Sequence, residues 1–385
     1  DTGTATIQQN SFGVNNPVFH KQPLILTILL LLLSLSAACA TSPSPTPTPE
    51  ADQPEATTAA TATANTLNLP TGFRDEILIE DLIRPTQMIT GPDGRLWVGM
   101  LVGGESAEQG QIVSVDLTTG ERTILLQELN KPTGLAVLDS YLWVALENSL
   151  IRAPLNDDYT TAGEIEVILS NMPYNGRSNG TLTISADNTL IYETSGRRSG
   201  NRPSAGSGTL WELDPATLES RPLATGLKGA YAHTFDENGR LWTTEIGDGT
   251  FNGGPPPGEL NLVVEGADFG WPQCIGFQEP ALNFDGTEEI CAQTRPPVVN
   301  LPENSTPTSV IPSPFTADSY LVALWVTGEV WEISATFTGD NATGEATPFI
   351  TSMGNPQHLL LLDDGSLLVS DYSNGTVYRV YQPSN

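Results

Sequence analysis

Positive charge is scarce in this chain of 385 residues. It has 16 lysine and arginine residues against 45 aspartate and glutamate residues, which gives a formal net charge of −29 at pH 7. Phosphate binding needs concentrated lysine and arginine, so no nucleic acid is expected as a partner. The same deficit argues against attraction to an anionic lipid surface. We interpret the acidic surface as one that limits aggregation of an exported protein.

Long apolar runs are also missing. The run Leu24–Leu33 is interrupted once by threonine and is shorter than the ~20 residues that a membrane span needs. It follows a histidine and a lysine and leads into LSLSAAC, which ends at Cys39, so it predicts a signal peptide. The end of this segment resembles the bacterial lipoprotein lipobox, with Ser36 where that pattern most often has leucine. The resemblance implies that Cys39 becomes the lipid-modified first residue; a plain secretory signal peptide is the alternative.

The segment from 41 to 66 shows no apolar periodicity. Prolines alternate with serine and threonine, and alanine–threonine repeats follow. Such a composition cannot bury enough surface to fold, and its proline-rich part stays extended. We therefore divide the chain into an N-terminal extension with a signal peptide (1–38), a lipidated cysteine with a linker (39–66) and a folded body (67–385).

Cysteine is rare, with three in the chain, and no Cys-x-x-Cys or Cys/His spacing suggests zinc. If Cys39 carries the lipid, Cys274 and Cys291 remain. In an oxidising compartment we expect these two to form a disulfide that closes a short loop.

A strand-like phrase with a polar turn and an apolar run recurs six times. The copies are GPDGRLWV (Gly91–Val98), LDSYLWV (Leu138–Val144), SADNTLIY (Ser185–Tyr192), DENGRLWT (Asp236–Thr243), TADSYLVAL (Thr316–Leu324) and LDDGSLLVS (Leu362–Ser370). Their matched leucines lie 46, 48, 51, 80 and 46 residues apart. Four of these intervals agree with the roughly 40–50 residues of one propeller blade. The sequence therefore predicts an all-β protein that folds as a six-bladed β-propeller.

The strand that enters each hairpin is expected to line the central channel, with its first residues at the channel mouth. These positions supply mainly Gln87, Thr181, Thr308 and Gln357. The last blade has only three strands of its own. The segment Gly72–Leu82 alternates well enough to supply the fourth, and its pairing with the last blade would close the ring.

The interval of 80 residues contains the insertion Gly270–Ser305, which holds both remaining cysteines. A long insertion on one side of a propeller usually forms part of its functional face. We expect the same here.

The segment GELNLVVEGADFGWPQC (Gly258–Cys274) resembles the soluble quinoprotein glucose/sorbosone dehydrogenases, which carry D-E-[LI]-N-L and then G-W-P at this point. Cys291 and the run Pro296–Val299 follow in the family's order, and the likeness extends over Leu67–Gln382. The resemblance implies a propeller that binds pyrroloquinoline quinone beside calcium and oxidises sugars. In such enzymes the quinone accepts the hydride, while the protein supplies orientation, charge and a base.

The resemblance assigns the base system to two arginines. Arg177 occupies the position of the catalytic base, and Arg197 occupies the position of the acid that orients it. An arginine cannot accept a proton near neutral pH. Arg177 is therefore a catalytic candidate by position whose chemistry departs from the family.

The resemblance also implies where cofactors would bind. Lys228, Asn179 and Arg197 are the expected quinone contacts. Gly247 and Asp248 correspond to the turn whose backbone holds calcium, and an ordinary turn is the alternative there.

Two histidines lie in the folded body, both on expected inner strands. We take His233 as a second catalytic candidate, with His358 as a weaker one. A structural role between blades is the alternative for each. Glu245, at the end of a strand near Gly247, is the best single acidic candidate.

Three functions remain open, because a fold does not determine the chemistry of its sites. The first is a quinone-dependent sugar dehydrogenase, and the second is a catalytically silent relative that binds a carbohydrate or a protein at the cell surface. The third is a calcium-dependent lactonase-type hydrolase. We expect a sugar or other small polar ligand and a monomer on the extracytoplasmic face of a bacterial membrane, held there only by the lipid.

Overall fold

The computed structural model describes residues 66–105, 108–160, 162–176, 179–247 and 249–383. These residues belong to one compact unit, Ala62–Asn385. The expected signal peptide, Cys39 and the linker up to residue 65 lie outside the described residues, as do Arg177 and Asp248. Within the described part of the chain, no helix is long and apolar enough to cross a membrane.

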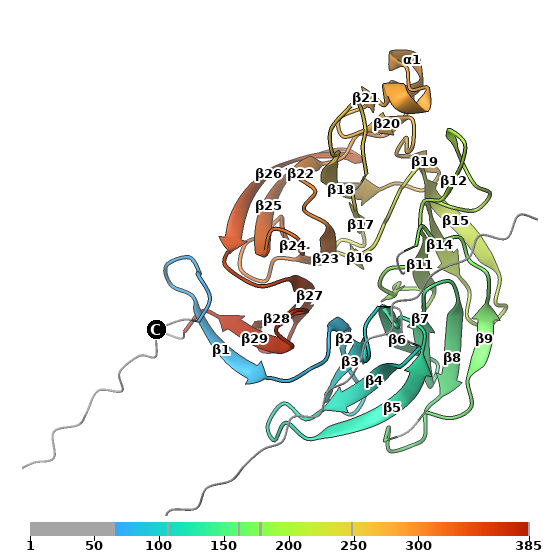
Figure 1. Ribbon diagram of the computed structural model, residues 1–385. Helices are drawn as coiled ribbons and strands as arrows, with labels where there is room; N and C mark the ends of the chain where they lie inside the picture. Colours follow the sequence, from blue (N-terminus) through green and yellow to red (C-terminus); the bar gives the residue numbers. More distant parts are fainter. Residues whose placement is uncertain (1–65, 106–107, 161, 177–178, 248, 384–385) are drawn as a thin grey trace, which may run out of the picture. The chain divides into compact units, whose positions relative to one another are not determined.

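Six small sheets surround a central channel, which confirms the predicted six-bladed propeller (Figure 1). In the first three blades, listed from the channel outward, neighbouring strands are antiparallel except β19, which runs parallel to β15. The first contains β2 (Pro85–Thr90), β3 (Leu96–Met100), β4 (Gly110–Val115) and β5 (Arg122–Leu129). The second contains β6 (Gly134–Leu138), β7 (Tyr141–Ala145), β8 (Leu150–Pro154) and β9 (Glu166–Leu169). The third contains β10 (Thr183–Ile184), β11 (Leu190–Thr194), β14 (Thr209–Leu213), β15 (Ser220–Thr225) and β19 (Ala267–Asp268).

The other three blades follow the same plan. The fourth contains β16 (His233–Phe235), β17 (Leu241–Glu245), β18 (Pro257–Val263) and β22 (Val299–Glu303). The fifth contains β23 (Pro307–Pro312), β24 (Ser319–Leu324), β25 (Glu329–Thr338) and β26 (Asn341–Ile350). The sixth contains β27 (Pro356–Leu361), β28 (Leu367–Asp371), β29 (Thr376–Tyr381) and β1 (Arg74–Ile79). Each innermost strand packs beside the next, and β27 returns to β2, so the ring is complete.

The ring is closed by the first strand of the chain, as predicted. β1 pairs antiparallel with β29, from Arg74 opposite Tyr381 to Ile79 opposite Val377. Arg379 of β29 also donates to the Glu76 carboxylate at 2.8 Å. The pairing covers an edge that the last blade would otherwise expose.

The recurring Asp-containing turn has a packing role. Asp236 accepts hydrogen bonds from the backbone N–H of Arg240 at 3.0 Å and from the indole of Trp242 at 3.0 Å. Asp93 accepts from the indole of Trp97 at 3.0 Å in the same way. Both tryptophans are fully buried, so one carboxylate holds the turn and orients the ring in the core.

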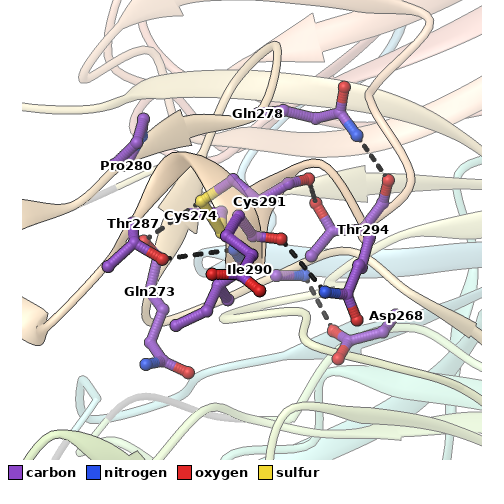
Figure 2. The surroundings of a disulfide bond; sticks show 12 residues. Asp268, Gln273, Cys274, Gln278, Pro280, Thr287, Ile290, Cys291 and Thr294 are labelled. Atoms are coloured by element: carbon purple, nitrogen blue, oxygen red, sulfur yellow. Dashed lines mark hydrogen bonds between the residues drawn. A yellow bond between two sulfur atoms is a disulfide. The ribbon is translucent and has the colours of Figure 1, made fainter.

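The insertion carries the small elements β20 (Cys274–Ile275), β21 (Glu279–Pro280), η1 (Leu282–Phe284) and α1 (Glu288–Cys291). Cys274 and Cys291 form the expected disulfide across a sequence separation of 17 residues (Figure 2). Thr287 caps α1 by accepting from the Ile290 N–H at 3.2 Å. A further hairpin, β12 (Arg198–Ser199) with β13 (Arg202–Pro203), extends from the third blade.

Candidate ligand site in the propeller channel

Polar side chains from the beginnings of the inner strands meet at one end of the channel. They line a cavity of about 120 Å³. The contributors, one from each of five blades, are Thr86, Thr133, Tyr231, Thr308 and Gln357. Thr308 and Gln357 thus lie at the channel mouth as expected. Gln87 is instead used inside the ring, where its amide donates to Leu182 O at 2.9 Å.

A second set of lining residues comes from one repeated position that we did not predict. In five blades, the residue that directly follows the second strand lines the cavity: Leu101, Ser195, Ile246, Trp325 and Tyr372. An alignment of the repeats contains this signal, because four of these residues lie five positions after the matched leucine of their repeat, and Trp325 lies four positions after its own.

Aromatic rings form part of the cavity wall. Trp325 and Tyr372 meet edge to face with their centroids 5.6 Å apart. The Tyr372 hydroxyl donates to the Glu105 carboxylate at 3.1 Å, which joins the sixth blade to the loop of the first. Tyr231 accepts from the Gln357 amide at 3.1 Å. The hydrogen bonds hold both phenol rings in place at the cavity.

The cavity also receives a buried carboxyl group, which the sequence reading missed. Glu193 lies near the end of β11, lines the cavity and is 3% exposed. Burial raises the pKa of Glu193 to about 8, although hydrogen bonds from the Ser195 hydroxyl and from the backbone of Ala230 and Gly180 partly oppose that effect. At neutral pH the group is therefore mostly protonated. The only sequence signal was an acidic residue at the end of the apolar run Leu190–Thr194.

The described lining does not fit pyrroloquinoline quinone, which is a tricarboxylate. None of the described residues that line the cavity is lysine or arginine, and two of them, Glu105 and Glu193, carry carboxyl groups. A trianion there would meet carboxyl groups where it needs cations. We therefore derive no step that passes through a quinone.

A second, much smaller cavity lies under the insertion. Glu245 of β17 and Glu259 of β18 stand opposite each other in the ladder, and both line this space of about 10 Å³ together with Lys228 and Gly247. Burial, followed by the neighbouring Glu259 carboxylate, raises the pKa of Glu245 well above its usual value. Burial also raises the pKa of Glu259 to about 7. The space is too small for a sugar or a quinone.

The calcium site expected at this turn stays a prediction. Gly247 packs so closely that a Cβ there would lie 1.8 Å from the carbonyl oxygen of Pro257, and Asp248 lies outside the described residues. Among the residues that the structure describes, no group of three or more His, Cys, Asp or Glu side chains is placed to hold a metal ion.

The expected cofactor contacts are not brought together on the cavity. Asn179 is buried, and its amide oxygen accepts from the backbone N–H of Ser195 at 3.1 Å, so it positions a lining residue. The side chain of Arg197 is exposed, while its carbonyl accepts from the Ser207 hydroxyl at 2.7 Å. Lys228 lines the smaller cavity, and its backbone N–H donates to Glu245 at 2.8 Å. Arg177, the expected base position, lies outside the described residues.

Both histidines lie inside the ring and do not line the cavity. His233 is 4% exposed and exchanges a hydrogen bond of 2.9 Å with the Thr183 hydroxyl, while its Nε2 has no hydrogen-bond partner among the residues that the structure describes. His358 accepts from the Met88 N–H at 3.4 Å. Burial lowers the pKa of each to about 3, so both are neutral at physiological pH. Their contacts fit the structural alternative.

The disulfide-bonded insertion contacts the β12–β13 hairpin of the third blade. The guanidinium of Arg198 lies 4.1 Å from the ring centroid of Phe284, and Asn201 donates to the Asp285 carboxylate at 3.0 Å. Within the insertion, Gln278 donates to Thr294 O at 2.6 Å (Figure 2). The insertion is therefore stabilised both by contacts within it and by contacts with the third blade.

Comparisons with known proteins identify similar folds. No family model matches the chain. An uncharacterized protein of Borreliella burgdorferi is 20% identical over 360 residues, which cover 83% of this chain and 91% of that protein.

Several solved structures of carbohydrate-active enzymes and sugar dehydrogenases superpose well. A calcium structure of a Trichoderma reesei carbohydrate-active enzyme of family AA12 has a TM-score of 0.68 and 15% identity, over 84% of this chain and 100% of that chain. The PQQ-bound aldose sugar dehydrogenase of Streptomyces coelicolor has a TM-score of 0.62 and 16% identity, over 81% and 99%. The apo-form of the soluble aldose sugar dehydrogenase of Escherichia coli has a TM-score of 0.64 and 15% identity, over 81% and 100%. The chain therefore has the fold of the PQQ-dependent sugar dehydrogenases.

Proposed function

We propose that this chain is a sugar-binding relative of the PQQ-dependent sugar dehydrogenases that binds a carbohydrate in the channel cavity without quinone-dependent oxidation. The observation that carries the proposal is the chemistry of the cavity wall. Its described residues offer hydroxyl, amide and carboxyl groups beside aromatic rings, with no lysine or arginine among them.

Such a wall suits a polyhydroxylated ligand. Ligand sites combine apolar and aromatic surface with a few placed polar groups that fix orientation. Here Trp325 and Tyr372 supply flat apolar surface, on which the C–H face of a sugar ring can pack. The Gln357 amide can both donate and accept hydrogen bonds. The hydroxyls of Thr86 and Thr133 donate to the carbonyl groups of Pro132 and Asn179 and keep lone pairs that can accept.

A quinone-dependent dehydrogenase is the second candidate, and the superposition on PQQ-bound structures favours it. Two features of this chain weigh against it. Arg177 stands at the expected base position and cannot accept a proton. The described cavity wall has carboxyl groups and no lysine or arginine, so it would not favour the three negative charges of PQQ. The lactonase alternative needs a cluster of metal ligands, for which the described residues offer no support.

The proposal includes a place in the cell. The lipobox-like segment before Cys39 supports export and lipid anchoring at the extracytoplasmic face of a bacterial membrane. The proline-rich segment that follows would hold the propeller away from the bilayer. We propose a monomer whose only membrane contact is the lipid.

The test measures sugar binding directly. Isothermal titration of the mature chain with neutral aldoses should give a dissociation constant on the order of 10⁻⁴ M, as expected for a small polar ligand. Trp325→Ala should weaken binding about tenfold, because it removes the aromatic surface. Val326→Ala is the matched control, since Val326 is the next residue, is 44% exposed and does not line the cavity.

Three results would overturn the proposal. If Trp325→Ala binds the aldose as tightly as Val326→Ala does, the cavity is excluded as the sugar site. If the unaltered chain binds no aldose, the cavity is excluded as well. Reduction of a redox dye by sugar after PQQ and calcium are added would replace the proposal with the dehydrogenase candidate.

A further inference from the structure

We propose that the sugar bound in the channel cavity carries a protonated amine, and that Glu193 is the group that recognises it. This inference rests on the proposed sugar-binding function and names the class of sugar. It would make the ligand an amino sugar.

The described wall of the cavity carries unbalanced carboxyl groups. The described cavity wall has two carboxyl groups, from Glu105 and Glu193, and no described lysine or arginine to balance them. Glu193 is hydrogen-bonded to the Ser195 hydroxyl and to backbone groups of Ala230 and Gly180. None of these partners is a cation.

The wider surroundings of Glu193 are also acidic. Among the described titratable groups, Tyr231 on the cavity wall and Glu245 on β17 interact with it electrostatically. Lys228 lines the smaller cavity on the side of Glu245 and Glu259. A buried carboxylate is costly unless it is paired, and a ligand ammonium entering the cavity would supply the pair.

The wall of the cavity is also rich in aromatic rings. Tyr231, Trp325 and Tyr372 border the same cavity. Aromatic faces attract cations, and sites that combine several such rings with a carboxylate favour ammonium groups. The bond from the Tyr372 hydroxyl to Glu105 at 3.1 Å adds a further negative group on this wall.

Binding should move one proton. Because burial raises the pKa of Glu193 to about 8, the free protein holds this carboxyl protonated at pH 6.5. When the ammonium of the ligand pairs with it, Glu193 ionises and its proton passes to the buffer, while the amine keeps its own proton. Binding of the amine ligand thus releases close to one proton from the protein, whereas binding of a neutral sugar releases none.

The experiment compares three ligands of nearly the same shape: glucosamine, glucose and N-acetylglucosamine, titrated calorimetrically into the mature chain at pH 6.5. Glucosamine should bind about tenfold more tightly than glucose, as expected for one partly buried charge-assisted contact. Its apparent binding enthalpy should change with the ionisation enthalpy of the buffer, while that of glucose should not. In Glu193→Gln the ratio of the two affinities should fall to about one. In Glu237→Gln, where the carboxyl group is exposed and does not line the cavity, the ratio should persist.

The outcomes separate this inference from the proposed function. Equal binding of glucose and glucosamine, without a buffer-dependent enthalpy, overturns the amine assignment and leaves sugar binding in place. A preference for glucosamine that survives in Glu193→Gln overturns the role of Glu193. If none of the three ligands binds, the proposed function itself fails.

Discussion

Single glycines decide how closely the inner strands approach each other. At Gly180, a Cβ would lie 1.8 Å from the carbonyl oxygen of Tyr231, and the next backbone N–H, that of Thr181, donates to the same oxygen at 2.7 Å. No side chain fits at Gly180 unless the third and fourth blades separate. The same glycine also borders Glu193, which receives a hydrogen bond from its backbone.

Gly180→Ala should therefore destabilise the protein by about 3 kcal/mol or more, because the inner strands must shift to relieve the clash. Urea unfolding followed by tryptophan fluorescence measures the change. Gly254→Ala is the matched control, since a Cβ there meets nothing within 4 Å, and it should change stability by no more than about 0.5 kcal/mol. Similar losses in the two variants would contradict this view of the channel wall.

The roles of single residues at the site were harder to predict than the roles of the residues that build the blades. Asn179 was expected at a cofactor, yet its amide oxygen accepts hydrogen bonds from Ser195. The sequence did not predict Glu193 as a site residue, because one acidic residue at the end of an apolar run has no distinctive pattern. Whether a polar residue faces a ligand or a neighbouring backbone depends on contacts between blades, which no local pattern specifies.

The strands and turns were predictable because each repeat contains its own polar turn residues and apolar strand residues. The six matched leucines and their polar turns led to six sheets, and the interval of 80 residues led to the insertion. The same repeats also contained the lining position after the second strand, at Leu101, Trp325 and Tyr372 among others. That position is recognisable only when the copies are aligned and the last residue of the second strand is known in each copy.

The closing strand β1 offers a matched pair of residues for a stability test. Ile79 is 4% exposed and packs in one core cluster with Leu82, Leu368 and Val377, whereas Ile77 on the same strand is 42% exposed. Ile79→Ala should cost about 2–4 kcal/mol of unfolding free energy because it leaves a cavity in that core, and Ile77→Ala should cost less than about 1 kcal/mol. Chemical denaturation of the two variants measures the difference. Equal costs would mean that β1 does not anchor the ring through its buried face.

At the scale of the whole molecule, the ring buries ionisable groups whose pKa values move in opposite directions. Burial raises the pKa of Glu193 to about 8 and that of Glu259 to about 7. Burial lowers the pKa of His233 and His358 to about 3. In each case the neutral form is favoured in the folded chain, as expected where polar groups are enclosed between sheets.

These shifts set the pH dependence of stability. The folded chain keeps a proton on Glu193 that the unfolded chain releases above its usual pKa of 4.5, so this group costs stability as the pH rises from 4.5 to about 8. The two histidines act in the other direction. The unfolded chain binds protons on them below pH 6.5, whereas the folded chain binds these protons only near pH 3, so the histidines cost stability as the pH falls between these values. Above pH 6.5 the histidines no longer contribute, so the glutamates should make the protein less stable with rising pH.

Glu193→Gln should remove part of that loss, since an amide has no proton to release. Between pH 6.5 and pH 9 the unaltered chain should lose on the order of 2 kcal/mol more unfolding free energy than the variant, which is about 1.4 kcal/mol for each pH unit up to the raised pKa. Urea unfolding at both pH values gives the four free energies. Glu237→Gln is the control, because Glu237 is exposed, and it should keep the full dependence. Parallel pH dependences in the unaltered chain and in Glu193→Gln would show that Glu193 is already ionised in the folded state, and the buried carboxyl would then need a cation beside it even without a ligand.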